Sequence, residues 1–401
     1  MRKKKSILTI LLILFFIGIA LLLWHFMRPK IQFKQASFAQ LPNWHATEMN
    51  TSFKAFQISC GAFIKQDPDK QVGTEVIPLR IKDWLPACNE ALKINSVNEA
   101  QAKSFFEKWF VPVEFYDKGQ VEGLFTGYYM PLLKGSLTPT PEFNVPIYET
   151  PRDMIHVDVN LFLPHLKMKP LIGRIHNAKL IPYYTREDIN KGAIKDTAKV
   201  LVWIHSPVDR IFLEIEGSGI IELQDKTKIY IGYSSQNGLP YRSIVGVLIK
   251  EGIMSKENAS MQGIKNYLES HPKEMDNILN QNKSFVFFQK LNTKAAYGTQ
   301  GVPLTPEYSL AVDLKWIPLG MPLWLNTSNP TMEDQDKNEP LNRLMIAQDS
   351  GGAIKGKVRA DVYWGSSEKA TIMGGHMKNK GYYWLLIPRQ FLPTLGKYLK
   401  N

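Results

Sequence analysis

Two carboxylates flank a glycine-rich stretch near the end of the chain, in the segment QDSGGAIKGKVRADVYW. Asp349 follows an apolar run that predicts a strand, and Asp361 lies in a second short run of alternating apolar and polar residues. Alternation places Asp361 opposite the apolar side chains of its strand, so that rigid backbone would hold the carboxylate away from the core. The glycines at 351, 352 and 356 would let a ligand approach closely. A carboxylate held in this way could act as a general acid.

Two other interpretations apply to the same segment. Asp-Ser-Gly-Gly is a common turn sequence, so residues 349–352 could form only a hairpin corner. The stretch from Gly351 to Lys357 also matches the first part of a phosphate-binding loop. Val358 stands where that motif needs Ser or Thr, and a strand follows where it needs a helix, so we reject a nucleotide site.

A third aspartate, Asp313, ends the predicted strand at residues 310–313. If the three carboxylates converge, their mutual repulsion would raise the pKa of at least one of them. A carboxyl group with a raised pKa can donate a proton near neutral pH, as cleavage of a glycosidic bond requires. Three carboxylates could also bind a metal ion, but their spacing does not fit a calcium loop, and we expect neither a metal nor a cofactor.

The elements that must position these residues belong to a chain of 401 residues, of which 44% are apolar and 21% charged. Such a chain can bury a large core, and its length favours two globular units. The net charge of +12 favours acidic partners such as anionic lipid or a carboxylate-bearing polymer. The positive residues are spread thinly, which argues against nucleic acid.

The chain starts with a basic and then an apolar segment. Residues 2–5 are Arg-Lys-Lys-Lys, and residues 7–27 are almost wholly apolar, long enough to cross a bilayer. Neither a small-x-small cleavage pattern nor a lipid-accepting cysteine follows, so we expect an uncleaved inner-membrane anchor, with a removed export signal as the alternative. The basic flank would stay in the cytoplasm and leave the chain after Lys30 in the periplasm.

Two cysteines, Cys60 and Cys88, lie early in the exported part. In an oxidising compartment such a pair favours a disulfide, which would stabilise the fold by roughly 3 kcal/mol. Two free buried thiols are the alternative. No histidine or further cysteine lies at ligand spacing, so metal binding is not expected.

Local patterns predict several elements. Residues 100–110 predict an amphipathic helix, and residues 121–222 a module of short strands that includes a strand at 212–219. Helices are predicted from residue 244, from Ser260 as an N-cap and from Pro272 as a first-turn residue. A further strand is expected at residues 285–289.

Several segments in a fixed order resemble those of one known family. They are TGYY at 126–129, EGSG at 216–219, NG at 237–238 with YRSI at 241–244, SMQ at 260–262, SFVFF at 284–288, and the segments around Asp313, Asp349 and Asp361. Each is weak alone, and the ordered set is specific. On these residues the chain resembles the membrane-bound lytic murein transglycosylase A family, including its C-terminal three-aspartate domain, over most of the exported length.

The resemblance implies a mainly β fold with some α structure. Residues 1–30 would form the basic flank and anchor, and residues 31–129 and 237–401 would together build a double-psi β-barrel domain. A smaller β-barrel domain would be inserted at residues 130–236, and a long groove between the domains would hold a glycan strand.

The resemblance also implies a reaction. The family cuts the β-1,4 bond between N-acetylmuramic acid and N-acetylglucosamine of peptidoglycan without water. Asp361, which matches the family's single catalytic aspartate, would protonate the glycosidic oxygen and then accept the proton of the muramoyl C6 hydroxyl, which forms a 1,6-anhydro ring. Asp349 would support this acid, and Asp313 would be structural. The implied substrate contacts are Thr126, Tyr128, Tyr129, Glu216, Gly217, Ser218, Gln236, Asn237 and Lys355.

The chain departs from the family at two points and leaves other classes open. Glu216 stands where Gln is expected, and no lipid-accepting cysteine is present. One alternative is a glycoside hydrolase that uses Asp349 and Asp361 as a carboxylate pair with water as the acceptor. Another is a non-catalytic protein that binds the cell wall. Other cell-wall enzymes are expected as further partners.

Overall fold

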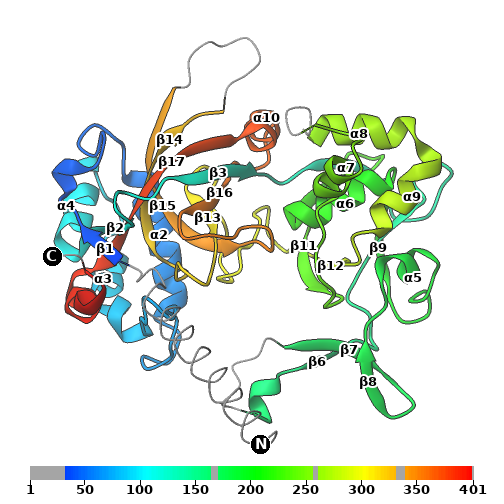
Figure 1. The fold of residues 1–401 in the computed structure, drawn as a ribbon, viewed down its shortest axis with the longest axis horizontal. Helices are drawn as coiled ribbons and strands as arrows, with labels where there is room; N and C mark the ends of the chain where they lie inside the picture. The colour runs from blue at the N-terminus through cyan, green and yellow to red at the C-terminus, as the bar shows by residue number, and fades with distance from the viewer. Residues whose placement is uncertain (1–31, 164–169, 256–260, 331–338, 400–401) are drawn as a thin grey trace, which may run out of the picture.

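The computed structural model describes residues 32–163, 170–255, 261–330 and 339–399. Figure 1 shows two bodies connected near the centre of the view, and a small arm that extends from the second body. The first body contains both ends of the described chain. The predicted anchor and the predicted N-cap Ser260 lie outside the described residues.

The first body is built on a closed ring of six strands. The ring order is β17, β14, β15, β13, β16 and β3, and pairing of β3 with β17 closes it. Two further strands, β1 and β2, extend the sheet beyond β17. The strands are β1 (Gln32–Gln35), β2 (Phe110–Tyr116), β3 (Gly123–Tyr128), β13 (Ser309–Val312), β14 (Pro322–Ser328), β15 (Pro340–Ser350), β16 (Arg359–Tyr363) and β17 (Lys378–Pro388).

The predicted alternation along residues 360–364 is confirmed. Ala360 and Val362 have no exposed surface and belong to the main core of this body. Tyr363 points to the other side, where it packs in a separate apolar cluster with Tyr128 and Ile220. Asp361 shares that second side, as the period of a strand requires.

Three helices cover the barrel on one side, α2 (Asn50–Phe63), α3 (Ile81–Lys93) and α4 (Glu99–Trp109). The predicted helix at 100–110 corresponds to α4, whose N-cap Asn98 accepts a hydrogen bond from the Gln101 amide. The smaller elements of this body are α10 (Glu368–His376) and the 3-10 helices η1 (Phe38–Gln40) and η3 (Arg389–Tyr398).

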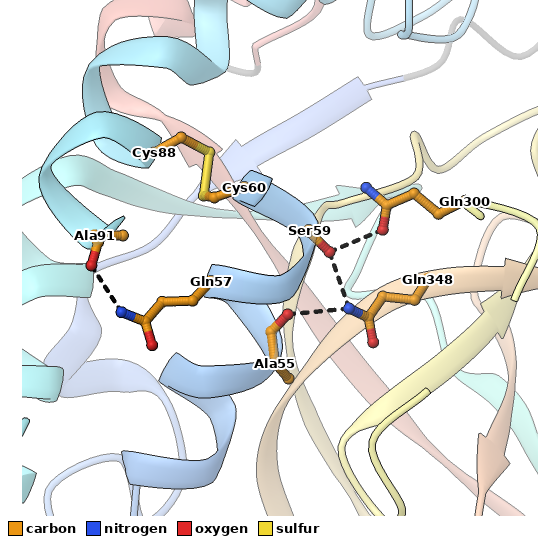
Figure 2. The surroundings of a disulfide bond; sticks show 8 residues. All are labelled: Ala55, Gln57, Ser59, Cys60, Cys88, Ala91, Gln300 and Gln348. Carbon is orange, nitrogen blue, oxygen red and sulfur yellow. Dashed lines mark hydrogen bonds between the residues drawn. A yellow bond between two sulfur atoms is a disulfide. The ribbon is translucent and has the colours of Figure 1, made fainter. Parts of the chain in front are cut away.

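A disulfide joins Cys60 of α2 to Cys88 of α3, with 4.9 Å between their Cα atoms (Figure 2). On its other side α2 contacts the barrel strand β15. The Gln348 amide donates to the carbonyl of Ala55 and to the Ser59 hydroxyl, each at 3.0 Å. Since Gln348 precedes Asp349, the cross-linked helix pair supports the strand that carries this carboxylate.

The second body contains a six-stranded sheet, in the order β12, β11, β10, β4, β9 and β5. Its strands are β4 (Leu132–Ser136), β5 (Val145–Tyr148), β9 (Val200–Ile204), β10 (Ser218–Glu222), β11 (Lys228–Gln236) and β12 (Val286–Lys290). The helices around it are α5 (Arg186–Asn190), α6 (Pro207–Glu216), α7 (Ile244–Lys250), α8 (Met261–Ser270) and α9 (Pro272–Asn280). The predicted boundary at residue 236 divides this sheet, because β12 pairs with β11.

The predicted strand at 212–219 is wrong, because most of this stretch belongs to the helix α6. Ser206 caps the helix by accepting a hydrogen bond from the Val208 amide, and Pro207 occupies its first turn. Gly217 ends it in a left-handed conformation, with φ +74°, and the strand β10 begins only at Ser218. By contrast, α9 begins at Pro272 and β12 lies close to the predicted residues 285–289.

The arm is a three-stranded antiparallel sheet that extends from the second body (Figure 1). It consists of β6 (Ile155–Val157), β7 (Leu171–His176) and β8 (Lys179–Pro182), and the 3-10 helix η2 (Val159–Leu161) follows β6. The sequence patterns did not distinguish it from the rest of the strand-rich module. In the part of the chain that the structure describes, no helix combines the length and apolar character needed to span a membrane.

Candidate active site

Strand pairing brings Asp361 and Asp349 to the same part of the barrel. On β16, Asp361 lies opposite Ala311 of β13 on one side and opposite Thr126 of β3 on the other. On β15, Asp349 lies opposite Ala311 from the far side of β13. The two carboxylates therefore flank one small residue of the central strand, although twelve positions separate them in the chain.

Asp361 accepts a strong hydrogen bond from a neighbouring hydroxyl. The Thr126 Oγ1 donates to its Oδ1 at 2.6 Å, and Arg359 Nη2 donates to the Thr126 oxygen at 2.8 Å. Burial raises the pKa of Asp361 to about 6, the Thr126 hydrogen bond and the Arg359 charge lower it, and the Asp349 charge raises it. Both protonation states of this carboxyl group are therefore accessible near neutral pH.

Asp349 is held by several donors at once. The Tyr128 hydroxyl donates to its Oδ2 at 2.9 Å. The amides of Thr299 and Ser350 both donate to its Oδ1 at 2.8 Å, and the Thr299 hydroxyl donates to the same oxygen at 2.9 Å. Burial raises the pKa of Asp349, while these hydrogen bonds oppose the shift. The carboxylate is thus fixed in orientation and is a source of negative field beside Asp361.

Glu216 brings a third carboxyl group toward the site from the second body. It is the last residue of α6, is 8% exposed, and its Oε2 accepts a hydrogen bond from the Tyr129 amide at 3.0 Å. Burial raises its pKa to about 8; the Tyr129 hydrogen bond opposes the shift, and the Asp361 charge adds to it. Glu216 therefore lies at the junction of the two bodies, where β3 leaves the barrel, rather than on an open surface.

Asp313 has a different environment from the other two aspartates. It is buried, and its Oδ2 accepts a hydrogen bond from the Gly356 amide at 2.9 Å. Its Oδ1 accepts one from the Lys315 amide at 3.1 Å. Asp313 thus connects the turn after β13 to the glycine-rich turn before β16. The charges that shift the pKa of Asp361 come instead from Arg359 and Asp349.

The remaining predicted contact residues fall into two groups. Tyr128 and Tyr129 are nearly buried, with the Tyr128 ring 5.2 Å from that of Tyr363 and the Tyr129 hydroxyl 3.3 Å from Met261 Sδ. Ser218 is also buried, and Gly217 is the C-cap of α6. Gln236 is half-buried and Lys355 is exposed, so these two side chains remain open to a ligand.

Asn237 is one predicted contact that the structure places inside the second body. Its side chain has no exposed surface, and its Nδ2 donates to the carbonyls of Tyr184 and Lys283 at 2.9 and 2.8 Å. Its Oδ1 accepts a hydrogen bond from the Phe285 amide at 3.0 Å. These bonds hold β11 to the segment before β12, and they leave the side chain unavailable to a substrate.

Sequence reasoning missed Thr299 and Arg359 at the site. Thr299 lies in an irregular stretch between β12 and β13, where no periodic pattern marks it. Arg359 begins β16, and strand alternation from Asp361 would have placed it on the same face. The alternation that places Arg359 beside Asp361 was therefore visible in the sequence. The partner of Arg359, Thr126, lies more than 230 positions away and was not.

Family models match both bodies. The MltA specific insert domain matches residues 124–289, and the 3D domain matches residues 308–387. A membrane-bound lytic murein transglycosylase A homolog from Buchnera aphidicola is 35% identical over 313 residues, which cover 76% of this chain and 75% of the relative.

Solved structures agree with the sequence relatives. MltA from Neisseria gonorrhoeae in its monoclinic form aligns with a TM-score of 0.74 and 32% identity, over 89% of this chain and 92% of that one. MltA from Escherichia coli with bound chitohexaose aligns with a TM-score of 0.63 and 25% identity, over 90% and 95% of the two chains. The fold and these relatives define the chain as a peptidoglycan lytic transglycosylase. Within that class, it belongs to the membrane-bound lytic murein transglycosylase A family.

Proposed function

We propose that Asp361 alone acts as general acid and then as general base in the cleavage of the bond between N-acetylmuramic acid and N-acetylglucosamine. The observation that carries this proposal is the buried Asp361 carboxyl group, whose pKa is raised to about 6 and whose Oδ1 is bound by Thr126. Its Oδ2 would give a proton to the glycosidic oxygen. The same oxygen would then take the proton of the muramoyl C6 hydroxyl, while that hydroxyl oxygen bonds to C1 and forms the 1,6-anhydro ring.

The neighbours of Asp361 suit a group that must both release and regain a proton. The Thr126 hydroxyl and the Arg359 guanidinium stabilise the carboxylate formed when the proton leaves. The nearby charge of Asp349 favours return of the proton. These opposite influences support a pKa near the working pH, at which a group is effective in both directions.

The environment of Asp349 favours this mechanism over hydrolysis by a carboxylate pair. Hydrolysis would require Asp349 to activate water or to attack the sugar directly. Both of its oxygens already accept hydrogen bonds from Tyr128, Thr299 and Ser350, which reduces their basicity. An internal hydroxyl needs little activation, because its effective concentration can reach roughly 10⁵ M or more.

We propose a glycan strand as the substrate, bound in a groove between the two bodies. The chitohexaose bound to the E. coli relative supports an oligosaccharide of this kind. The side chains of Gln236 and Lys355 are candidates for contact with sugar or stem peptide, and Thr126 and Tyr128 would lie beside the cleaved bond. The positive net charge of +12 suits a polymer whose peptide stems carry carboxylates.

For the fold we propose a double-psi arrangement in the first body and an inserted barrel in the second. The parallel pairs β13–β15 and β3–β16, within a ring that is otherwise antiparallel, support the first. Close approach of β12 to β5, the two end strands of the open sheet order, supports the second. Because β12 pairs with β11, we extend the insert to about residue 290.

We propose that the protein is periplasmic and held at the inner membrane by residues 1–30, where it would work beside other cell-wall enzymes. Its relatives are named membrane-bound. The disulfide between Cys60 and Cys88 also supports an oxidising compartment.

The test is product analysis after incubation of the full chain, in detergent, with purified peptidoglycan sacculi. Mass spectrometry should find muropeptides lighter by one water than hydrolysed ones. Asp361→Asn should reduce their release by roughly 10²–10⁴-fold, because the carboxamide cannot transfer the proton. Asp117→Asn, at an exposed turn position, is the matched control. Hydrolysed ends would instead establish the two-carboxylate mechanism, and full activity of Asp361→Asn would refute the assignment of the acid.

A further inference from the structure

The arm formed by β6, β7 and β8 has one sheet face that is entirely apolar. Ile155 pairs with Gly173 and Gly173 with Pro182, while Val157 pairs with Leu171 and Ile175 with Leu180. Paired residues, and residues two apart along a strand, share a face. We call this set the apolar face: Ile155, Val157, Leu171, Gly173, Ile175, Leu180 and Pro182.

The apolar face is turned toward solvent. Ile155 is 37% exposed, Leu171 45%, Ile175 58% and Leu180 39%. Antiparallel sheets with one solvated face normally place polar residues on it, and here the usual pattern is reversed. Seven of the sixteen exposed large hydrophobic side chains among the described residues lie in this small arm, in η2 or in the two residues after η2. Clusters of this kind mark interaction sites.

The opposite face of the arm is fixed to the second body. His156 Nε2 lies 3.2 Å from Ser235 Oγ, and the Arg174 guanidinium lies 4.1 Å above the Tyr184 ring. Ile172, also on this face, packs against the cluster that contains Phe285. The apolar face therefore points outward because the other face is engaged.

The residues after β6 extend the apolar surface. The helix η2 follows at the end of the arm where Val157 pairs with Leu171. Leu161 and Phe162 are 79% and 74% exposed, the highest values among the large hydrophobic side chains of the described residues. An aromatic and an aliphatic side chain that project this far into water are suited to insertion into the apolar part of a lipid surface.

The net charge of the arm favours an anionic surface, and its basic side chains lie on the sheet face opposite the apolar face. Its charged side chains in the described residues are Arg174, Lys179 and Asp158. Asp158 is used locally, as its carboxylate accepts a hydrogen bond from the Asn160 amide at the start of η2. Lys179 is exposed at the start of β8, where it pairs with His176 on the opposite face, and the whole chain carries a net charge of +12.

We propose that the apolar face, together with Leu161 and Phe162, lies on the surface of an anionic lipid bilayer. The predicted membrane span at residues 7–27 is the argument for this occupant. Only four residues, 28–31, connect its end to Gln32, the start of β1, so at most about 17 Å of chain lies between bilayer and fold. A second copy on this face would bring two basic proteins together, which their mutual repulsion opposes. This inference rests on the proposed anchor and not on the proposed chemistry.

With the arm on the lipid, the anchored enzyme has two points of attachment. A single N-terminal span would let the two bodies rotate freely about the anchor. A second contact through the arm would fix which side of the molecule faces the membrane and which side faces the glycan.

The test measures the depth of a nitroxide label at Leu161→Cys in the full chain, reconstituted into vesicles of phosphatidylethanolamine and phosphatidylglycerol. The two native cysteines are bonded to each other and so are not labelled. The label at 161 should be shielded from a water-soluble nickel complex and accessible to oxygen. A reference label at Leu137→Cys, 61% exposed and outside the arm, should show the opposite behaviour. Equal nickel accessibility at both positions would overturn the proposal.

A second variant tests the face itself. Ile175→Glu with Leu180→Glu, at exposed positions, should restore nickel accessibility at 161, whereas Leu132→Glu, 51% exposed and outside the arm, should not. Muropeptide release from sacculi in detergent should be unchanged in both, which shows that they fold and separates this test from that of the chemistry. Shielding that disappears at less than one chain per vesicle would assign the face to a second copy and would overturn the proposal. Shielding of the label at 161 that persists in the Ile175→Glu, Leu180→Glu variant would also overturn the proposal.

Discussion

At the scale of single residues, the candidate site contains three carboxyl groups whose charges influence one another but whose hydrogen-bond partners differ. Asp361 has one hydroxyl donor, Asp349 has four hydrogen bonds, and Glu216 has one backbone amide. The pKa values of Asp361 and Glu216 are therefore raised to different extents, to about 6 and about 8. Burial raises both pKa values and one hydrogen bond opposes the shift at each, but only Asp361 also lies near a positive charge, that of Arg359, which lowers its pKa.

Thr126→Val should raise the pKa of Asp361, because it removes a hydrogen bond that stabilises the carboxylate. Activity that needs protonated Asp361 falls as pH rises through this pKa, so the alkaline limb of the pH–rate profile should move to higher pH. The maximal rate should also drop by roughly tenfold or more, since the carboxyl group loses its orientation. Thr126→Ser keeps the hydroxyl and should retain the wild-type profile. An unshifted limb in Thr126→Val would show that this hydroxyl does not control the acid.

Glu216 should make stability depend on pH. Its folded pKa, about 8, lies above its value in an unfolded chain, so the folded state binds the extra proton. This contribution is fully present below about pH 4.5 and is lost as pH rises toward 8. Glu216→Gln should remove the dependence and be more stable at pH 7 by on the order of 3 kcal/mol.

Urea unfolding at pH 6.5 and 8.5 measures this effect in a range where Asp361 is already mostly ionised. The wild type should lose stability between the two values and Glu216→Gln should lose much less. Glu122→Gln, at an exposed position, should follow the wild type. Parallel curves for the wild type and Glu216→Gln would mean that Glu216 is ionised in the folded protein.

At the scale of elements, short-range patterns predicted the strands of the site but not their closure. β16 was predicted because alternation around Asp361 is a local signal. The error at α6 has a local cause as well. Its apolar residues suit either element, and the decisive signals were the cap at Ser206 and the first-turn Pro207, which lie just outside the segment considered. The pairing of β3 with β17 leaves no local trace, since it joins residues more than 250 positions apart.

The disulfide should matter for stability more than for catalysis. Cys60→Ala with Cys88→Ala should lower the free energy of unfolding by roughly 3 kcal/mol, mainly because the unfolded chain gains freedom. The contacts of Gln348 with Ala55 and Ser59 remain, so β15 should still hold Asp349 and the rate on sacculi should stay close to wild type. Chemical unfolding with and without reductant measures this. Reductant should weaken the wild type alone, and a variant as stable as the oxidised wild type would contradict the expectation.

At the scale of the whole molecule, the chain passes from the first body to the second and returns. After the barrel strand β3, residues up to about 290 build the second body. The chain then re-enters the barrel with β13. The family resemblance implied an inserted domain that ends at residue 236, at a polar turn. In the structure the second body continues to β12, at about residue 290. The helices α7 to α9 follow that turn, and their apolar faces pack with α6 instead of with the barrel. Only tertiary contacts distinguish these two choices, since an amphipathic helix does not specify its partner.

The closed ring also sets the order in which the enzyme becomes competent during its own synthesis. Because β17 at residues 378–388 pairs with β3 at residues 123–128, the barrel cannot close until residues 378–388 have left the ribosome. The closed ring around Thr126 and Asp361 would form only at that stage, so a chain still being synthesised would carry no lytic activity. Chains truncated before Lys378 should therefore leave sacculi intact, whereas a truncated chain that releases anhydromuropeptides would show that ring closure is dispensable.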